Sequence, residues 1–248
     1  MSDSVRLARE RDFHNEYFLH EQESRAAQNK YYFAIQHGVD RCEQLLLEHS
    51  KGRDALEFGC GTGWLACHIA PGAKSVVGID LSDVVVDQAN ERCVKEGINN
   101  TRFAAMNAEE MTFEDGSFDL VYGSAILHHL DVPHSVAEIH RVLRRGGIAL
   151  FWEPLGHNPI INLYRRLTPS KRSVDEHPLM RSDIELIRRH FPDLKIHYFG
   201  LLTLLSVPWH SSKLGPGLRR ALDLIDQALV RLGLRWYCWY VLIEAKKS

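Results

Sequence analysis

Glu57-Phe58-Gly59-Cys60-Gly61-Thr62-Gly63 is the stretch that best indicates the architecture of this 248-residue chain. It closes a short apolar run over 55–58 and opens a segment of helical character over 62–70. Glycine reaches positive φ without steric cost and lets the backbone approach a ligand closely. A glycine loop between a buried strand and a helix lies at the ligand-binding edge of doubly wound α/β sheets. The stretch therefore predicts such a sheet, with a ligand at the carboxyl end of its first strand.

Short apolar runs alternate with helical segments beyond this loop. The expected strands cover 55–58, 75–80, 101–106, 118–122, 148–152, 195–199 and 237–244, and the expected helices between the first five cover 62–70, 83–96 and 133–145. A further helix is expected after Ser182, because Ser182 and Glu185 have the spacing of a capping box. Short buried strands that alternate with helices indicate a parallel sheet covered on both faces. The sequence therefore predicts an α/β fold with a seven-stranded, mostly parallel, Rossmann-like sheet.

Segments outside the alternating pattern predict a cap and a lid. Residues 1–50 carry charge throughout and read as two helices, so we expect an N-terminal helical cap, with the main domain over 51–248. The stretch of about 155–181 is rich in proline and predicts a lid loop. A helical insertion is expected over about 201–235, where apolar positions recur at helical spacing.

Composition limits the classes of partner and compartment. The formal net charge is −2, so no overall excess of positive charge favours a nucleic-acid partner. The five cysteines form no CxxC pair, which indicates reduced thiols rather than a disulfide framework or a zinc site. The polar start of the sequence does not resemble a signal peptide. We therefore expect a cytoplasmic protein.

Two classes of cofactor use a glycine loop at this place, and they differ in charge. A dinucleotide requires the spacing GxGxxG and puts its pyrophosphate at the helix N-terminus. This chain has GxGxG, with Glu57 at the mouth of the loop. A carboxylate about 4 Å from a phosphate charge would cost about 4 kcal/mol at an effective dielectric near 20. The same carboxylate suits an ammonium and a sulfonium, so the sequence favours S-adenosylmethionine over NAD.

Asp80 supports a ligand that carries a ribose. It ends the second expected strand, about 20 residues after the glycine loop, where a carboxylate can accept hydrogen bonds from both ribose hydroxyls. The alternative is that Asp80 only caps the following helix beside Ser82.

Five motifs carry a resemblance to a known family. LEFGCGTGW (56–64), VVGIDLS (76–82), NAEEMTF (107–113), FDLVYGSAILHHL (118–130) and RVLRRGGIALFWEP (141–154) resemble the motifs of class I methyltransferases. The chain is most similar to the small-molecule subgroup (methyltransferase type 11) that includes enzymes of ubiquinone and menaquinone biosynthesis. The resemblance covers about 54–154, whereas 155–248 match in arrangement only.

The resemblance implies a role for individual residues in binding S-adenosylmethionine. Those expected at its methionine end are Glu57, Gly59, Cys60, Gly61, Gly123 and Ser124, and those expected at its ribose and adenine are Asp80, Leu81, Asn107 and Ala108. Many relatives have aspartate at the position of Asn107, and an amide can still accept from the adenine amino group.

A pair of histidines follows the fourth strand and predicts the catalytic centre. His129 is expected to act as a base or to position the acceptor, with His128 beside it, because an imidazole takes up a proton near neutral pH. Tyr32 and Glu153 are expected to face the acceptor. Similar quinone O-methyltransferases have glutamate where this chain has His128, so no metal site is predicted. Asp131 is expected either to orient a histidine or to start the next helix.

The expected function is transfer of a methyl group from S-adenosylmethionine to a small, hydrophobic biosynthetic intermediate, with O-methylation favoured. The alternatives are an NAD-type oxidoreductase and a non-catalytic S-adenosylmethionine-binding protein. The apolar stretch 201–209 either lines a pocket for the acceptor, touches a membrane surface, or packs in the core or a dimer contact. It is too short for a transmembrane segment. The sequence leaves open the identity of the acceptor and whether the protein is a monomer or a homodimer.

Overall fold

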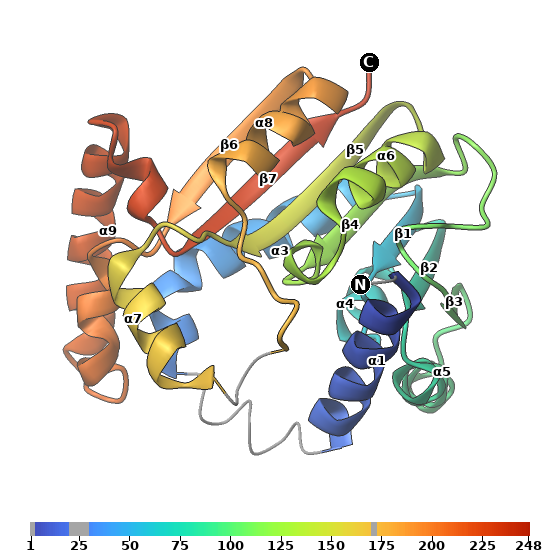
Figure 1. Cartoon of the computed structure of the whole chain (residues 1–248), viewed down its shortest axis with the longest axis horizontal. Coiled ribbons are helices and arrows are strands. Elements are labelled where there is room, and N and C mark those ends of the chain that lie inside the picture. The colour runs from blue at the N-terminus through green and yellow to red at the C-terminus, as the bar shows by residue number, and fades with distance from the viewer. Residues whose placement is uncertain (1–2, 20–29, 170–172) are drawn as a thin grey trace.

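A seven-stranded sheet forms the centre of the computed structural model, which describes residues 3–19, 30–169 and 173–248. Its strand order is β3-β2-β1-β4-β5-β7-β6 (Figure 1). The strands are β1 (Asp54–Phe58), β2 (Ser75–Asp80), β3 (Thr101–Ala105), β4 (Phe118–Ser124), β5 (Leu143–Pro154), β6 (Asp193–Phe199) and β7 (Tyr240–Lys246). β1 to β5 run parallel, and β7 runs antiparallel between β5 and β6. The predicted seven-stranded, mostly parallel sheet is confirmed.

The order of the strands reverses beside β1, whose neighbours are β2 on one side and β4 on the other. In doubly wound sheets a ligand binds at this switch point, outside the carboxyl ends of the strands. Glu57 pairs in register with Gly78 of β2 and with Tyr122 of β4. The fold therefore places the glycine loop after β1, the end of β2 and the end of β4 around one point.

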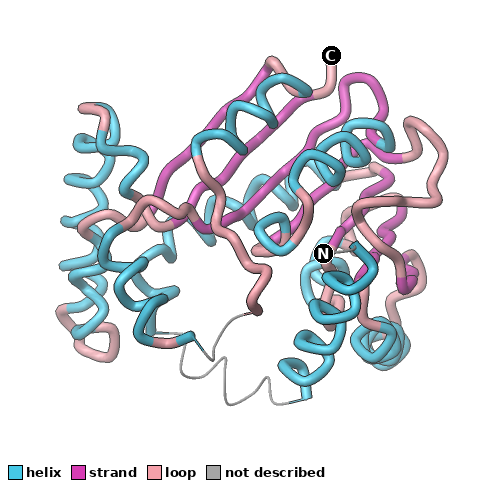
Figure 2. The backbone as a smooth tube through the Cα atoms, viewed as in Figure 1, coloured by secondary structure: helices cyan, strands magenta, loops and turns pink. Residues whose placement is uncertain are grey.

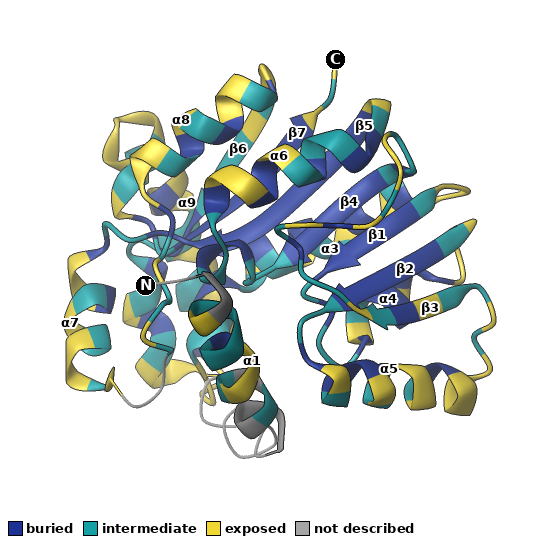
Figure 3. Ribbon diagram, turned by 45° about the vertical axis from the view of Figure 1, so that its right-hand side comes forward, coloured by how far each residue is buried: buried dark blue, intermediate teal, exposed yellow. Residues whose placement is uncertain are grey.

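Helices cover both faces of the sheet (Figure 3). On one face lie α3 (Gln36–Ser50), α4 (Trp64–Ile69) and α5 (Asp83–Glu96), and on the other lie α6 (Val132–Val142) and α8 (Arg181–His190). Each helix buries one apolar stripe, as Leu45 and Leu46 do for α3 and Val136 and Ile139 do for α6. Such burial holds the strand ends, and with them the site residues, in fixed positions.

Further helices lie beyond the carboxyl ends of the strands. They are α1 (Asp3–Leu19), α7 (Pro159–Leu167) and α9 (Gly215–Arg231), with short 3-10 helices η1 (Phe33–Ile35), η2 (Leu127–His129), η4 (Thr203–Trp209) and η5 (Leu234–Tyr237). α1 and α7 lie below the sheet in Figure 1, and α9 lies to its left (Figures 1 and 2). Among the described residues, no helix is long and apolar enough to cross a membrane.

Several predicted boundaries were wrong. The helix expected over 133–145 ends at Val142, because Leu143 already pairs with Phe118 at the start of β5. α8 begins after Met180 rather than Ser182, since the Asp183 carboxylate accepts a hydrogen bond from the Met180 backbone amide.

The stretch expected to be a lid loop, about 155–181, contains α7. Asn158 caps this helix by accepting hydrogen bonds from the amides of Ile160 and Ile161, both at 3.0 Å. Pro159 is at the first helical position, where its missing N–H costs nothing. The last predicted strand begins at Tyr240 instead of Tyr237, which belongs to η5. Parts of the expected cap and lid, 20–29 and 170–172, lie outside the described residues.

Candidate active site

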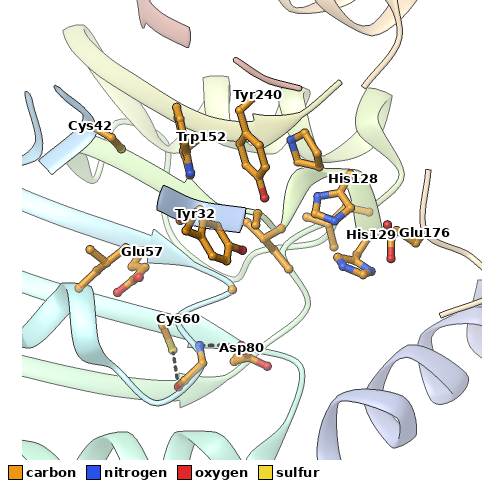
Figure 4. A pocket seen from close by; sticks show the side chains of 18 of the residues that line it. Tyr32, Cys42, Glu57, Cys60, Asp80, His128, His129, Trp152, Glu176 and Tyr240 are labelled. Carbon is orange, nitrogen blue, oxygen red and sulfur yellow. Dashed lines mark hydrogen bonds between the residues drawn. The ribbon is translucent and has the colours of Figure 1, made fainter. Parts of the chain in front are cut away.

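A cavity of about 900 Å³ opens at the carboxyl ends of β1, β2 and β4. Most of the residues predicted for the cofactor and the acceptor line it, namely Tyr32, Glu57, Gly59, Cys60, Gly61, Asp80, Leu81, Asn107, Ala108, Ser124, His128 and His129. Figure 4 shows Glu57, Cys60 and Asp80 on one side of this space and His128, His129 and Glu176 on another. The sequence motifs therefore meet in one cavity.

The glycine loop forms a cradle at the end of β1. Gly59, Gly61 and Gly63 have φ of 66°, 49° and 72°, a region that side chains rarely adopt. A Cβ on Gly59 would lie 2.3 Å from a side-chain carbon of Ile126, so a larger residue does not fit. The Cys60 amide donates to the Ile79 carbonyl at 3.0 Å, which fastens the loop to β2. Both the φ values and the close packing require glycine.

Asp80 holds the loop from the end of β2. Its carboxylate accepts hydrogen bonds from the Gly61 amide at 2.9 Å and from the Ser82 amide at 3.0 Å. Ser82, not Asp80, caps α5, because its hydroxyl accepts from the Val85 amide at 3.3 Å. The alternative that Asp80 is a simple helix cap is therefore wrong. Asp80 lines the cavity, where its carboxylate can also receive hydroxyl donors of a ligand.

Glu57 is the buried acid of the site. It is only 3% exposed, and the Tyr122 hydroxyl donates to its carboxylate at 3.2 Å. Burial raises the pKa of Glu57 to about 8, although the hydrogen bond from Tyr122 opposes this. A cationic group in the cavity would replace the lost hydration of the carboxylate and restore its charge. The site thus fits a ligand whose end carries positive charge.

Two residues expected to touch the cofactor also have a role in the local structure. Gly123 is not among the described residues that line the cavity, and a Cβ there would lie 2.4 Å from the Phe58 ring. The close packing of the Phe58 ring against the backbone explains why this position is a glycine. The Asn107 side-chain oxygen accepts from the Glu109 amide at 3.0 Å, so it shapes the loop after β3 while lining the cavity.

The two histidines are each paired with a carboxylate. His128 Nδ1 lies 2.7 Å from Glu153 Oε2, and His129 Nδ1 lies 3.2 Å from Glu10 Oε2. The ring centroids are 4.2 Å apart, so the imidazoles lie side by side. Glu10 comes from α1, which Arg9 also ties to the body through an ion pair with Asp175 at 2.7 Å.

Glu153, which was expected to face the acceptor, is not among the described residues that line the cavity. It is fully buried, and its second oxygen accepts from the amides of Ile126 and Leu127 at 2.9 and 2.8 Å. Burial raises the pKa of Glu153 to about 7. Its place on β5 lets it orient His128 from beneath. Asp131 orients neither member of the pair, since it caps α6 by accepting from the His134 amide at 3.0 Å.

An aromatic and apolar wall also lines the cavity. Tyr32 lines the cavity with its ring centroid 6.3 Å from that of Trp239 and 6.4 Å from that of Tyr240. Further apolar members of the wall come from α1, α7 and η4: Leu7, Phe13, Ile160, Ile161, Leu204 and Val207. This wall suits the body of a hydrophobic molecule.

Sequence reasoning did not find Glu10 or Glu176 as site residues. One nitrogen of each histidine and one carboxylate oxygen of Glu176 lie within 4.8 Å of one another. Glu176 stands in the segment before α8, where the His177 amide donates to the His128 carbonyl at 2.9 Å. No local pattern marks either glutamate, because only the tertiary structure brings them to the histidines.

Part of the chain matches a known protein family. Residues 56–151 match a family described as a methyltransferase domain. An uncharacterised methyltransferase of Synechocystis sp. is 32% identical over 135 residues, which cover 48% of this chain and 61% of that protein. A 27-O-demethylrifamycin SV methyltransferase of Amycolatopsis mediterranei is 36% identical over 99 residues, which cover 39% of this chain and 36% of that protein. The chain thus spans less than two thirds of the length of these relatives.

The solved structure of a geranyl diphosphate methyltransferase in complex with SAM has the same fold. Its TM-score is 0.62 at 19% identity, and the match covers 83% of this chain and 84% of that one. The family match falls on the span that carries the glycine loop, Asp80 and the histidine pair. Residues 56–151 therefore match the methyltransferase-domain family, and the chain has the Rossmann-like fold of class I methyltransferases, which take S-adenosylmethionine as cofactor.

Proposed function

We propose that this protein transfers a methyl group from S-adenosylmethionine to a hydroxyl oxygen of a hydrophobic small molecule. The observation that carries the proposal is the mixed lining of one cavity. Glu57, Asp80 and the glycine loop contribute polar and acidic groups, aromatic and aliphatic side chains contribute apolar surface, and His128 and His129 line the same space. An acidic side suits a sulfonium nucleoside, and an apolar side suits the body of an acceptor.

The size of the cavity supports binding of two molecules together. Its volume of about 900 Å³ is near the top of the range of about 300–1,000 Å³ for small-molecule sites. Leu204 and Val207 of η4 line it, whereas Leu205 and Trp209 of the same helix are exposed. This pattern favours the prediction that the apolar stretch 201–209 contacts the acceptor.

Methyl transfer depends more on aligning the acceptor oxygen with the methyl carbon and sulfur than on activating the acceptor. The acceptor oxygen forms a bond to the methyl carbon, the bond from that carbon to sulfur breaks, and its electron pair stays on sulfur as a thioether. Holding the two reactants in line and excluding water supplies most of the acceleration. The hydroxyl proton must leave, and His129 and His128 are the titratable groups placed to receive it or to hold the oxygen. The carboxylates of Glu10 and Glu153 fix the directions of their rings.

The relative from Amycolatopsis mediterranei supports transfer to oxygen, because its name describes an O-methyltransferase. The acidic residue at the loop mouth and the family match favour S-adenosylmethionine over the dinucleotide alternative.

The test is turnover of methyl-labelled S-adenosylmethionine with metabolite extracts separated by polarity. We expect label to enter a product of the apolar fraction, with S-adenosylhomocysteine released in equal amount, and Asp80→Ala to lower the signal strongly when the cofactor is not saturating. Calorimetry should detect binding of S-adenosylmethionine but not of NAD. Label that enters only polar products, protein or RNA, or no label transfer at all, would contradict the proposal.

A further inference from the structure

The cluster of His128, His129 and Glu176 has the composition of a transition-metal site. Its three ligand atoms, two imidazole nitrogens and one carboxylate oxygen, lie within 4.8 Å of one another and line the cavity. The side chains are mostly shielded from solvent, with exposed fractions of 7%, 11% and 11%. Figure 4 shows the three side chains directed toward a common space.

Each imidazole has the outer partner that metal-binding histidines require. Glu153 Oε2 lies 2.7 Å from His128 Nδ1, and Glu10 Oε2 lies 3.2 Å from His129 Nδ1. A carboxylate that accepts the Nδ1 proton fixes the tautomer with its lone pair on Nε2, the form that binds a metal. A chain of carboxylate, histidine and metal is the usual arrangement around such ions.

The backbone holds Glu176 beside the histidines. The His177 amide donates to the His128 carbonyl at 2.9 Å, and the Leu179 amide donates to the Pro154 carbonyl at 2.9 Å. The third ligand therefore comes from a segment fastened to the same strand ends as the other two. Arg165 forms a long ion pair with the Glu176 carboxylate, at 3.9 Å, which is beyond hydrogen-bond distance.

The charges in this corner favour a divalent cation. Glu10, Glu153 and Glu176 surround two imidazoles that are neutral when they act as ligands. Arg165 lies 3.9 Å from Glu176, and Arg6, near the His129 carbonyl, is paired with Glu109, so the carboxylates still outnumber these guanidinium groups. Two nitrogens and one oxygen suit zinc, cobalt or iron, whereas magnesium and calcium prefer oxygen alone. We propose that His128, His129 and Glu176 bind one transition-metal dication of the zinc type at the acceptor end of the cavity.

The role of this ion rests on the proposed function. With three protein ligands, a zinc-type ion keeps an open position, here on the cavity side. An acceptor hydroxyl bound there becomes more acidic and loses its proton to solvent. Its oxygen then bonds to the methyl carbon as the carbon–sulfur bond breaks and the electron pair stays on sulfur. In this state the histidines position the acceptor through the metal instead of receiving the proton themselves.

The test measures metal binding without turnover. Full-length protein stripped with a chelator is titrated with Co²⁺ while visible absorption is recorded, and Zn²⁺ is then added as competitor. We expect one equivalent of Co²⁺ per chain, an absorption spectrum typical of four or five nitrogen and oxygen ligands, and its loss on addition of Zn²⁺. Glu176→Gln should weaken binding about tenfold or more, and His129→Ala about 100-fold.

His134→Ala is the matched control. His134 Nδ1 also lies 2.8 Å from a carboxylate, that of Asp131, but it is exposed and belongs to no three-ligand group within the described residues. Its loss should leave the Co²⁺ titration unchanged. Affinity for S-adenosylmethionine, measured on the same samples without metal, reports whether each variant is folded.

Absence of stoichiometric Co²⁺ binding to protein that binds S-adenosylmethionine would overturn the metal site and leave the proposed function standing. Unchanged Co²⁺ affinity in Glu176→Gln and His129→Ala would also overturn it. Conversely, stoichiometric metal binding in a protein that transfers no methyl group would retain the site and contradict the proposed function.

Discussion

The two sides of the cavity are built in different ways. The side proposed for the cofactor comes from short motifs at consecutive strand ends, with Gly59 and Gly61 after β1 and Asp80 at the end of β2. The side proposed for the acceptor gathers Glu10 from α1, His129 from η2 and Glu176 from the segment before α8. Local backbone geometry fixes the first side, whereas long-range contacts fix the second. A binding site can therefore combine a part set by local sequence with a part set by the whole fold.

The largest expected effect is a loss of turnover in His129→Ala without a matching loss of cofactor affinity. His129→Ala should lower the turnover number about 100-fold or more, because the group proposed to hold or deprotonate the acceptor is lost. The dissociation constant of S-adenosylmethionine should change less than about twofold, since His129 belongs to the acceptor side. Steady-state kinetics and calorimetry measure both quantities, with His134→Ala as control. Undiminished turnover would remove His129 from the reaction.

The reverse experiment uses Asp80. Asp80→Ala removes the acceptor of the Gly61 and Ser82 amides as well as the predicted ribose contact. Hydrogen bonds to a charged group are worth about 1.5–3 kcal/mol, so cofactor affinity should fall about 10- to 100-fold. Asp83→Ala, an exposed carboxylate in the first turn of α5, should leave affinity unchanged. Equal affinities in the two variants would contradict the ribose assignment.

The pH dependence of cofactor binding tests Glu57. Because burial raises its pKa to about 8, the carboxyl is mostly protonated near neutral pH. A cationic ligand needs the carboxylate, so binding releases a proton and affinity rises up to about tenfold per pH unit below pH 8. Glu57→Gln should bind about tenfold more weakly at pH 8 and show a flatter profile by calorimetry. Glu110→Gln, an exposed acid, serves as control.

The same raised pKa affects stability without ligand. The folded protein binds the Glu57 proton more tightly than the unfolded chain, so stability falls as pH rises from about 4.5 to about 8. Glu57→Gln removes this contribution, and its unfolding temperature should decline less over that range than that of the wild type. A steeper decline in the variant would show that Glu57 is not a buried acid of raised pKa.

The smallest expected effect concerns the apolar wall. Leu204→Ser should raise KM for a hydrophobic acceptor a few-fold, because burying part of a leucine side chain is worth about 1 kcal/mol. Cofactor affinity should not change. Leu205→Ser alters the neighbouring residue, which is 55% exposed, and should leave KM as it was. A KM that shifts equally in both variants would point to an effect on η4 as a whole.

The same difference between local and long-range contacts determines which features could be predicted from the sequence. The sheet and the glycine loop were predictable because apolar runs and glycines reflect local geometry, and Asp80 follows from its place at a strand end. Gly123 matched a motif, but its small size serves packing against Phe58, which only the structure reveals. Glu153 was correctly placed on β5, yet its burial beneath His128 depends on the path of 126–128 over the sheet edge.

Helix and strand boundaries failed where tertiary pairing overrides local preference. Leu143 follows a helical pattern, but pairing with Phe118 in β4 draws it into β5. Glu10 and Glu176 carry no sequence signal, because a carboxylate in a charged helix or a loop looks like any other surface acid. Pattern alone cannot select the two carboxylates that the fold brings next to the histidines.

The position of Glu10 on α1 ties this helix to the histidine pair. Because Glu10 Oε2 lies 3.2 Å from His129 Nδ1, a displacement of α1 that withdraws Glu10 also takes away the carboxylate partner of His129. The orientation of an imidazole at the strand ends therefore depends on a helix 119 residues away in the sequence.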